Sequence, residues 1–160
     1  MIKPMYYLFL FLGFGHFANA QIQKGTKTAG GSISFYSITE SAKIVSNGTT
    51  INEASRSNTQ LILAPKAGLM LTDNIMAGTG LFLSSGGGSS FAISPFGRYY
   101  FPAGDRFYAF GEFSLLLGNA TSWNIGGGAS YFIKDNVAIE GLLTFNRVVQ
   151  LGVGLQFYFD

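Results

Sequence analysis

Apolar and polar residues alternate with a period of two along most of the chain beyond residue 27, most clearly in the last segment. In "VVQLGVGLQFYF", residues 148–159, every second position is apolar. The apolar face comprises Val149, Leu151, Val153, Leu155, Phe157 and Phe159, and the other face comprises Gln150, Gly152, Gly154, Gln156 and Tyr158. Successive side chains of a β-strand point to opposite faces, so this pattern predicts a strand with one apolar face.

Seven earlier segments show similar alternation and are also predicted to be strands. The eight segments are residues 28–37, 59–71, 75–83, 91–101, 107–117, 122–133, 137–146 and 148–159. The connections "TDN", "PAGD" and "KDN" are short and rich in turn-forming residues. Residues 38–57 are rich in Ser, Thr and Asn and predict an exposed, mobile loop. Tight turns alternate with the other connections, which predicts an up-and-down antiparallel sheet with both termini at the tight-turn end.

The predicted sheet is expected to close on itself, because an open antiparallel sheet leaves two unpaired edges. A barrel in water would turn its apolar face inward. Here the apolar face is continuous, and the other face holds Gly, Ser, Gln, Asn and charged residues. A barrel with these two faces is suited to lipid, with its apolar face outward. In lipid, a closed barrel satisfies the hydrogen bonds of every backbone group. The predicted fold is therefore all-β, an eight-stranded antiparallel up-and-down transmembrane β-barrel.

Aromatic residues on the apolar face gather toward both ends of the predicted strands. Those near the tight turns are Tyr99, Phe101, Phe107, Tyr131 and Phe159, and those near the other end are Phe35, Phe91, Trp123 and Phe145. Transmembrane barrels carry such girdles where their strands cross the two membrane interfaces. We therefore expect these nine residues to form two girdles in contact with lipid.

Four charged residues fall on the polar face of the predicted strands: Lys66, Arg98, Glu112 and Glu140. The interior of an eight-stranded barrel is just wide enough to be filled by side chains. Buried charges must pair there, because an unpaired one is costly. We therefore predict an ion network of these four residues that plugs the lumen. In the alternative, the four charges are separately hydrated in a wet interior.

The first 20 residues are predicted to be a secretory signal peptide. Lys3 precedes the apolar run "MYYLFLFLGFG", and Ala18-Asn19-Ala20 fits the small-x-small rule for cleavage. The apolar run is shorter than the about 20 residues that a membrane-spanning helix needs. The predicted organisation is a signal peptide at 1–20 and a barrel domain at 21–160. Cleavage would remove His16, the only histidine, from a chain that has no cysteine.

Composition limits the chemistry that such a barrel can perform. Charged residues make up 11% of the chain, against about 25% in average soluble domains. A net charge of +2 gives no footprint for nucleic acid. Beyond residue 20 the chain has no histidine base and no cysteine nucleophile or thiolate ligand. We expect no enzyme activity, no catalytic residue, no cofactor and no metal.

Four stretches of the sequence resemble a known family. They are "APKAGLMLTDNIMAGTGLFL", "ISPFGRYYFP", "GGASYFIKDNVAIEGLLTF" and "GVGLQFYF", which cover most of residues 61–159. Their order and spacing are similar to those of small outer-membrane barrels of the OmpA/OmpX type, in the compact form found in Bacteroidetes-like bacteria. The resemblance implies export to the outer membrane, with its lipid and the barrel assembly machinery as partners. Gly154, Phe157 and Phe159 resemble the C-terminal signal that this machinery reads.

The sequence leaves three functions open. The favoured one is a non-enzymatic outer-membrane barrel with a plugged polar lumen and a structural or surface-interaction role. In that role, residues 38–57 would present a surface to an extracellular ligand. The second is a narrow pore for small solutes. The third is a soluble, lipocalin-like ligand-binding barrel, which would need its apolar face inside.

Overall fold

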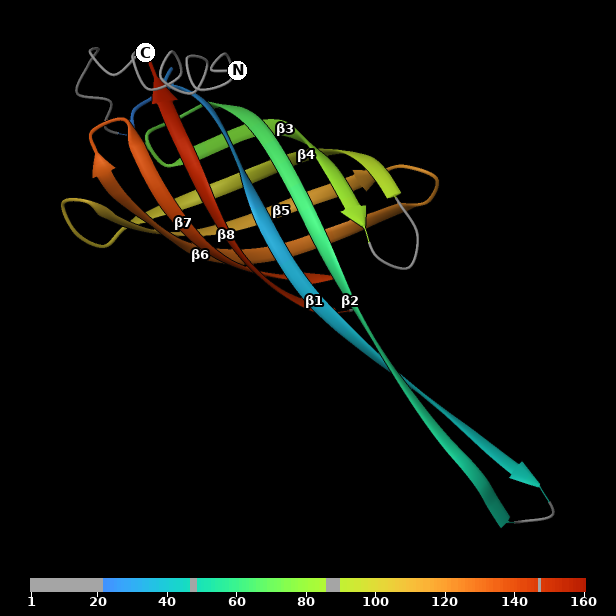
Figure 1. Cartoon of the computed structure of the whole chain (residues 1–160). Helices are drawn as coiled ribbons and strands as arrows, with labels where there is room; N and C mark the ends of the chain where they lie inside the picture. Colours follow the sequence, from blue (N-terminus) through green and yellow to red (C-terminus); the bar gives the residue numbers. More distant parts are fainter. Residues whose placement is uncertain (1–21, 47–48, 86–89, 147) are drawn as a thin grey trace, which may run out of the picture.

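The computed structural model describes residues 22–46, 49–85, 90–146 and 148–160 and, for residues 38–46 and 49–58, the backbone alone. The strands are β1 (Lys27–Ser46), β2 (Thr49–Met70), β3 (Ile75–Ser85), β4 (Ser90–Pro102), β5 (Phe107–Leu117), β6 (Thr121–Lys134), β7 (Val137–Asn146) and β8 (Val148–Phe159). Each strand pairs antiparallel with the next, and β1 pairs with β8, which closes a barrel (Figure 1). The predicted eight-stranded up-and-down barrel is confirmed. Among the described residues, no helix is long and apolar enough to cross a membrane.

The register between β1 and β8 closes the barrel. Lys27 pairs with Phe159 and Phe35 pairs with Leu151, so the start of β1 lies beside the end of β8. The turns that follow β2, β4 and β6 lie at this end, which we call the tight-turn end. The opposite end carries the β1–β2 hairpin and is called the hairpin end (Figure 1). Because the sheet is closed, the barrel wall has no free edge for another chain to pair with.

The two faces of the barrel wall reverse the arrangement of a soluble protein. Large apolar side chains are exposed on the outer surface of every strand, among them Phe35, Leu63, Leu81, Ile93, Phe113, Ile125, Leu143 and Val153. Alternate positions are buried in the lumen and include Arg98, Glu140, Gln150 and Gln156. A continuous apolar exterior suits hydrocarbon, not water. The lipocalin-like alternative does not fit, because the apolar face lies outside.

The prediction of a loop at residues 38–57 is wrong for residues 38–46 and 49–57, which form strands. β1 and β2 continue past the barrel as a paired ribbon, from Tyr36 opposite Gln60 to Ser46 opposite Thr49. This ribbon projects from the hairpin end (Figure 1). The sequence pattern failed here because polar residues occupy consecutive positions, so no apolar face marks the strands. Backbone hydrogen bonds between β1 and β2 continue both strands here, although no apolar face marks them in the sequence.

Apolar and aromatic side chains fill the lumen toward the tight-turn end. The buried cluster consists of Ile22, Met70, Met76, Phe96, Tyr100, Phe110, Phe132, Ala138 and Tyr158. Gly128 on β6 is the register partner of Phe110 on β5. A Cβ atom added at Gly128 would lie 2.0 Å from the carbonyl oxygen of Gly141 and 2.8 Å from the ring of Phe110. Glycine is therefore required here for the phenylalanine ring to enter the lumen.

Candidate functional site in the barrel lumen

The four charged residues predicted for the lumen come from four strands and meet in its interior. Lys66 lies on β2, Arg98 on β4, Glu112 on β5 and Glu140 on β7. Oε2 of Glu112 lies 3.0 Å from Nζ of Lys66 and 2.6 Å from Nη2 of Arg98. Nη1 of Arg98 lies 2.5 Å from Oε1 of Glu140. The structure thus joins all four in one chain of ion pairs, which we call the ion network.

Two of these ion pairs cross the lumen. Arg98 and Glu112 are register partners on neighbouring strands, so their contact runs along the wall. Lys66 reaches from β2 to Glu112 on β5, and these strands are not adjacent in the barrel. Arg98 likewise reaches from β4 to Glu140 on β7. These two contacts bridge separate parts of the wall across the lumen.

Burial makes the ion network depend on complete pairing. The side chains of Arg98 and Glu140 are 0% and 2% exposed, and charge removed from water is costly unless it is paired and hydrogen-bonded. Two basic groups face two acidic ones here. Nη1 of Arg98 also donates to the Tyr100 hydroxyl at 3.0 Å, and the Ser130 hydroxyl donates to Glu140 at 2.9 Å. The guanidinium lies 3.9 Å from the ring centre of Phe110, a cation–π contact.

Alternation in the sequence placed the charges but did not identify all of their partners. Ser130 reaches Glu140 because the two are register partners on β6 and β7, and the sequence does not show which register the strands adopt. Tyr100 stands two positions after Arg98 on the same face, which the alternation does show. The Tyr158 hydroxyl lies 3.1 Å from that of Tyr100. This contact between β8 and β4 has no signal in the sequence.

Aromatic rings pack against one another in the lumen toward the tight-turn end. Tyr100 packs against Tyr108, Tyr108 against Phe132 and Phe132 against Tyr158, with ring centres 6.4, 5.6 and 4.9 Å apart. We call these four residues the aromatic layer. Its members come from β4, β5, β6 and β8, so the rings converge from several parts of the wall. A solute crossing the barrel would meet the ion network and then this layer.

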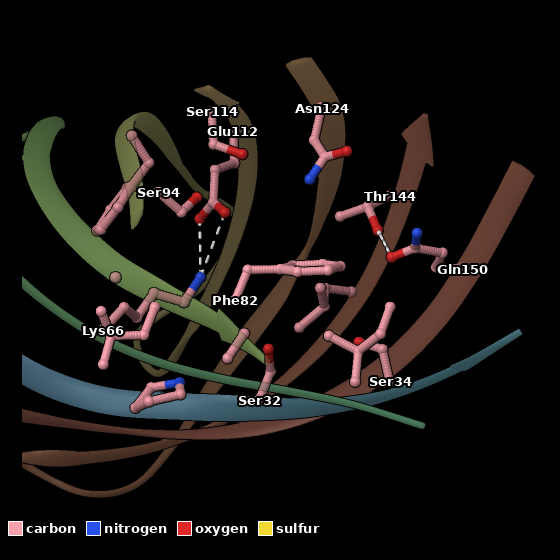
Figure 2. Close-up of a pocket in the computed structure, with 17 residues that line it drawn as sticks. Ser32, Ser34, Lys66, Phe82, Ser94, Glu112, Ser114, Asn124, Thr144 and Gln150 are labelled. Carbon is pink, nitrogen blue, oxygen red and sulfur yellow. Dashed lines mark hydrogen bonds and ion pairs between the residues drawn. The ribbon is translucent and has the colours of Figure 1, made fainter. Parts of the chain in front are cut away.

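On the hairpin side of the ion network lies a cavity of about 60 Å³ with a mixed polar and apolar lining, which we call the vestibule (Figure 2). Its polar lining includes Ser32, Ser34, Ser94, Ser114, Asn124, Thr144 and Gln150. Lys66 and Glu112 border it as the nearest part of the ion network (Figure 2). Among the described residues, the lumen therefore mixes polar and apolar side chains near the hairpin end and is mainly aromatic near the tight turns.

Gln156 is fully buried in the lumen, and neither atom of its side-chain amide has a hydrogen-bond partner among the described residues. An unsatisfied buried polar group costs about 1–3 kcal/mol. We expect Gln156→Met, which keeps the length and removes the amide, to raise the free energy of unfolding by about 1 kcal/mol. Urea unfolding in lipid vesicles measures this change.

Gln150→Met is the matched control for Gln156→Met. Gln150 accepts a hydrogen bond from Thr144 at 3.3 Å, so its replacement removes a bond and should lower stability. If the two variants lowered the free energy of unfolding equally, the prediction would be contradicted. The side-chain amide of Gln156 would then be hydrogen-bonded in the folded barrel.

The nine residues predicted for the aromatic girdles lie on the outer surface, with 42–56% of each side chain exposed. The rings of Tyr99 and Phe101 pack together, with centres 4.6 Å apart. Of the predicted assembly signal, Phe157 and Phe159 are exposed at the end of β8. Gly154 is closely packed, since an added Cβ atom would lie 2.7 Å from a carbonyl oxygen of β1. Contact of the girdles with lipid and reading of β8 by the assembly machinery stay predictions.

Two further expectations concern metal binding and export. Within the described ranges, no group of three or more His, Cys, Asp or Glu side chains is placed to hold a metal ion. The predicted signal peptide at residues 1–20 lies outside the described residues. The boundary between signal peptide and barrel domain therefore stays a prediction.

Comparison with known proteins finds structural likeness alone. No protein-family model matches the chain, and no curated protein matches it. A de novo designed transmembrane β-barrel is 11% identical with a TM-score of 0.63, over 86% of this chain and 98% of that one. The designed barrel TMB2.3, solved by NMR in solution, is 15% identical with a TM-score of 0.55, over 88% and 98%. The outer membrane protein OprG from Pseudomonas aeruginosa is 12% identical with a TM-score of 0.42, over 90% and 100%.

The likeness to the two designed barrels shows the fold and nothing finer, because the identities are low. The OmpA/OmpX-type resemblance has no matching family model and stays an expectation. The closed antiparallel sheet of this chain agrees with the fold of the two designed transmembrane barrels. The chain is an eight-stranded transmembrane β-barrel.

Proposed function

We propose that this chain is a non-enzymatic outer-membrane β-barrel protein with a structural or surface-interaction role and a closed lumen. The observation that carries the proposal is the pair of ion bridges across the lumen, Lys66 to Glu112 and Arg98 to Glu140. Passage of a solute would require these buried ion pairs to separate, which is costly in a medium of low dielectric constant. The aromatic layer is a second barrier in series.

The outer surface supports an outer-membrane location. Closed barrels with an apolar exterior and aromatic girdles at both interfaces are the architecture of outer-membrane proteins. Such barrels have short periplasmic turns and longer extracellular loops, so the tight-turn end would face the periplasm and the hairpin end the exterior. A signal peptide at residues 1–20 would direct export through the inner membrane.

The chemistry of the lumen supports a role without catalysis. Both of the lumen carboxylates, Glu112 and Glu140, are held in ion pairs. The chain beyond residue 20 contains no histidine and no cysteine, which are the commonest bases and the strongest nucleophiles of hydrolases. We propose no cofactor for this protein.

Three partners follow from the proposed location. Outer-membrane lipid would contact the aromatic girdles, and the barrel assembly machinery would read Gly154, Phe157 and Phe159. Residues 38–57, whose described part forms the ribbon, would present an extracellular ligand site. The paired strands would carry this surface beyond the membrane. Nucleic acid is not a proposed partner, given the net charge of +2.

Recording in planar lipid bilayers tests the closed lumen. We expect the wild-type protein to give no steady conductance, because both barriers obstruct the lumen. Because the two barriers act in series, the variant Arg98→Ser/Glu140→Ser/Phe132→Ala/Tyr158→Ala, which removes one ion bridge and two rings of the aromatic layer, should increase ion flux. The matched control Phe107→Ala/Tyr131→Ala removes two exposed rings from the outer surface and should leave the flux unchanged. A heat-dependent shift on a denaturing gel verifies that each variant has folded.

A narrow pore is the alternative function. The vestibule favours it, because a cavity with a partly polar lining already occupies the part of the lumen on the hairpin side of the ion network. Large, steady conductance from the wild-type protein would overturn the closed lumen and establish the pore instead.

A further inference from the structure

We propose that the vestibule binds a small, uncharged, hydroxyl-bearing solute of the polyol class. The inference goes beyond the proposed function and does not depend on whether the lumen conducts. Three properties of the cavity carry it: its unpaired polar groups, its balance of charge and its size.

Polar groups without a protein partner surround the vestibule. The hydroxyl groups of Ser32, Ser34, Ser94 and Ser114 line it, and no hydrogen bond joins them to another described residue. Asn124 is 8% exposed and also lines the vestibule, with no hydrogen bond from its side chain to another described residue. Its side chain points into the lumen (Figure 2). Because buried polar groups are nearly always hydrogen-bonded, the cavity is suited to a molecule that supplies donors and acceptors together.

The donor and acceptor types select hydroxyl groups in the ligand. Each serine hydroxyl can donate one hydrogen bond and accept others, and an asparagine side chain offers both an acceptor and a donor. A ligand with donors alone or acceptors alone would leave part of this lining unpaired. Hydroxyl groups carry both functions on one atom, so a polyol can satisfy several lining residues at once.

The charged groups at the vestibule favour an uncharged occupant. Nζ of Lys66 lies 3.3 and 3.0 Å from the two carboxylate oxygens of Glu112, so the two charges that border the cavity neutralise each other. A bound ion would add an unpaired charge or would have to open this pair, and either is costly in the lumen. A neutral solute leaves the ion network as it is.

Apolar side chains and the volume set the size of the occupant. Phe82, Phe96 and Leu142 also line the vestibule, and the Phe82 ring lies across it between Lys66 and Thr144 (Figure 2). Small-molecule sites commonly combine apolar walls with a few polar groups that orient the ligand. The volume of about 60 Å³ has room for about four waters at roughly 10–15 Å³ each. This room suits a polyol of about three carbons, so glycerol is the probe.

Titration of the ¹⁵N-labelled barrel in detergent micelles with glycerol tests the proposal by NMR. We expect saturable shifts at the backbone amides of Ser94, Ser114 and Asn124, and none at amides of the ribbon. 1-Propanol has the same carbon chain with one hydroxyl, and acetate and methylammonium are charged probes of similar size. All three should bind at least about tenfold more weakly, a difference of about 1.4 kcal/mol.

Two variants link the shifts to the vestibule. Ser114→Leu fills the cavity and Asn124→Leu removes the unpaired amide at nearly constant volume, so each should raise the apparent Kd for glycerol about tenfold or more. The matched control is Ser84→Leu, because Ser84 lies outside the vestibule lining and contacts Ser90 at 2.6 Å; it should leave the Kd within about twofold. A heat-dependent gel shift verifies folding of each variant.

Three results would overturn the proposal. Shifts that rise linearly without saturation would mean a solvent effect, with ordered water as the only occupant of the cavity. An unchanged Kd in both Ser114→Leu and Asn124→Leu would place the binding elsewhere. Saturable binding of acetate or methylammonium in preference to glycerol would show a site for ions.

Discussion

Arg98→Met should lower the free energy of unfolding by about 3–5 kcal/mol. The guanidinium joins the two acidic members of the ion network, 2.6 Å from Glu112 and 2.5 Å from Glu140. Methionine replaces the aliphatic stem of arginine but carries no charge, so among the described residues Glu140 would keep only the hydroxyl of Ser130 as a hydrogen-bond partner. A buried carboxylate without a counter-charge is the costly state. Urea unfolding in lipid vesicles, followed by the fluorescence of the single tryptophan, Trp123, measures the loss.

The double variant Arg98→Met/Glu140→Gln separates charge balance from packing. It removes one basic and one acidic group and leaves Lys66 paired with Glu112 at 3.0 Å. We therefore expect it to be more stable than Arg98→Met alone, although it has lost one more native side chain. Lys66→Met/Arg98→Met leaves both carboxylates unpaired and should be the least stable of the three. A loss below about 1 kcal/mol for Arg98→Met would support separately hydrated charges in a wet lumen and contradict the dry ion network.

Val153→Lys should lower the free energy of unfolding by about 2–4 kcal/mol, because it places a charge in the hydrocarbon near the membrane midplane. Val153 lies near the middle of β8 (Val148–Phe159), and 63% of its side chain is exposed on the outer surface. In water the same substitution at such an exposed position would have little effect. The size of the loss in lipid vesicles therefore reports which solvent the outer surface meets.

Leu71→Lys is the control for depth in the membrane. Leu71 is 48% exposed and directly follows β2 at the tight-turn end, where a lysine can reach the interface and should cost about 0–1 kcal/mol. Val153→Leu keeps an apolar residue at the first site and should be nearly neutral. If both lysine variants lost the same small amount of stability, the barrel would not be surrounded by hydrocarbon along its length.

The strands from β3 to β8 were predictable from the sequence because two different environments meet along each of them. One face contacts an apolar surrounding and the other a filled lumen, so alternation marks the strands from β4 to β8. For β3 the sequence predicted the strand but not its faces. Past Phe35 and before Leu61 the contrast between the two faces is lost, and the prediction of a loop at residues 38–57 was wrong for residues 38–46 and 49–57. Strand pairing there depends on the backbone of the neighbouring strand, which leaves no pattern in the side chains.

The sequence predicted which residues form the ion network but not which of them contact each other. Alternation assigned Lys66, Arg98, Glu112 and Glu140 to the inside of the barrel. The face on which a residue lies depends only on its position within its own strand, so no knowledge of the other strands was needed. Alternation could not show that Arg98 bonds two carboxylates while Lys66 bonds one. It also gave no sign of the vestibule, because a cavity is the space that side chains from many strands leave between them.

The sequence alone therefore determined the strands of the barrel wall, the faces of most of these strands and the closed, lipid-facing architecture, since these follow from local periodicity and from the cost of an unpaired edge. The tertiary structure decided the contacts across the lumen, the extension of β1 and β2 into a ribbon, and the division of the interior into vestibule, ion network and aromatic layer. Those features depend on the register and tilt that eight strands adopt together. That arrangement brings side chains from strands far apart in the sequence to within hydrogen-bonding distance.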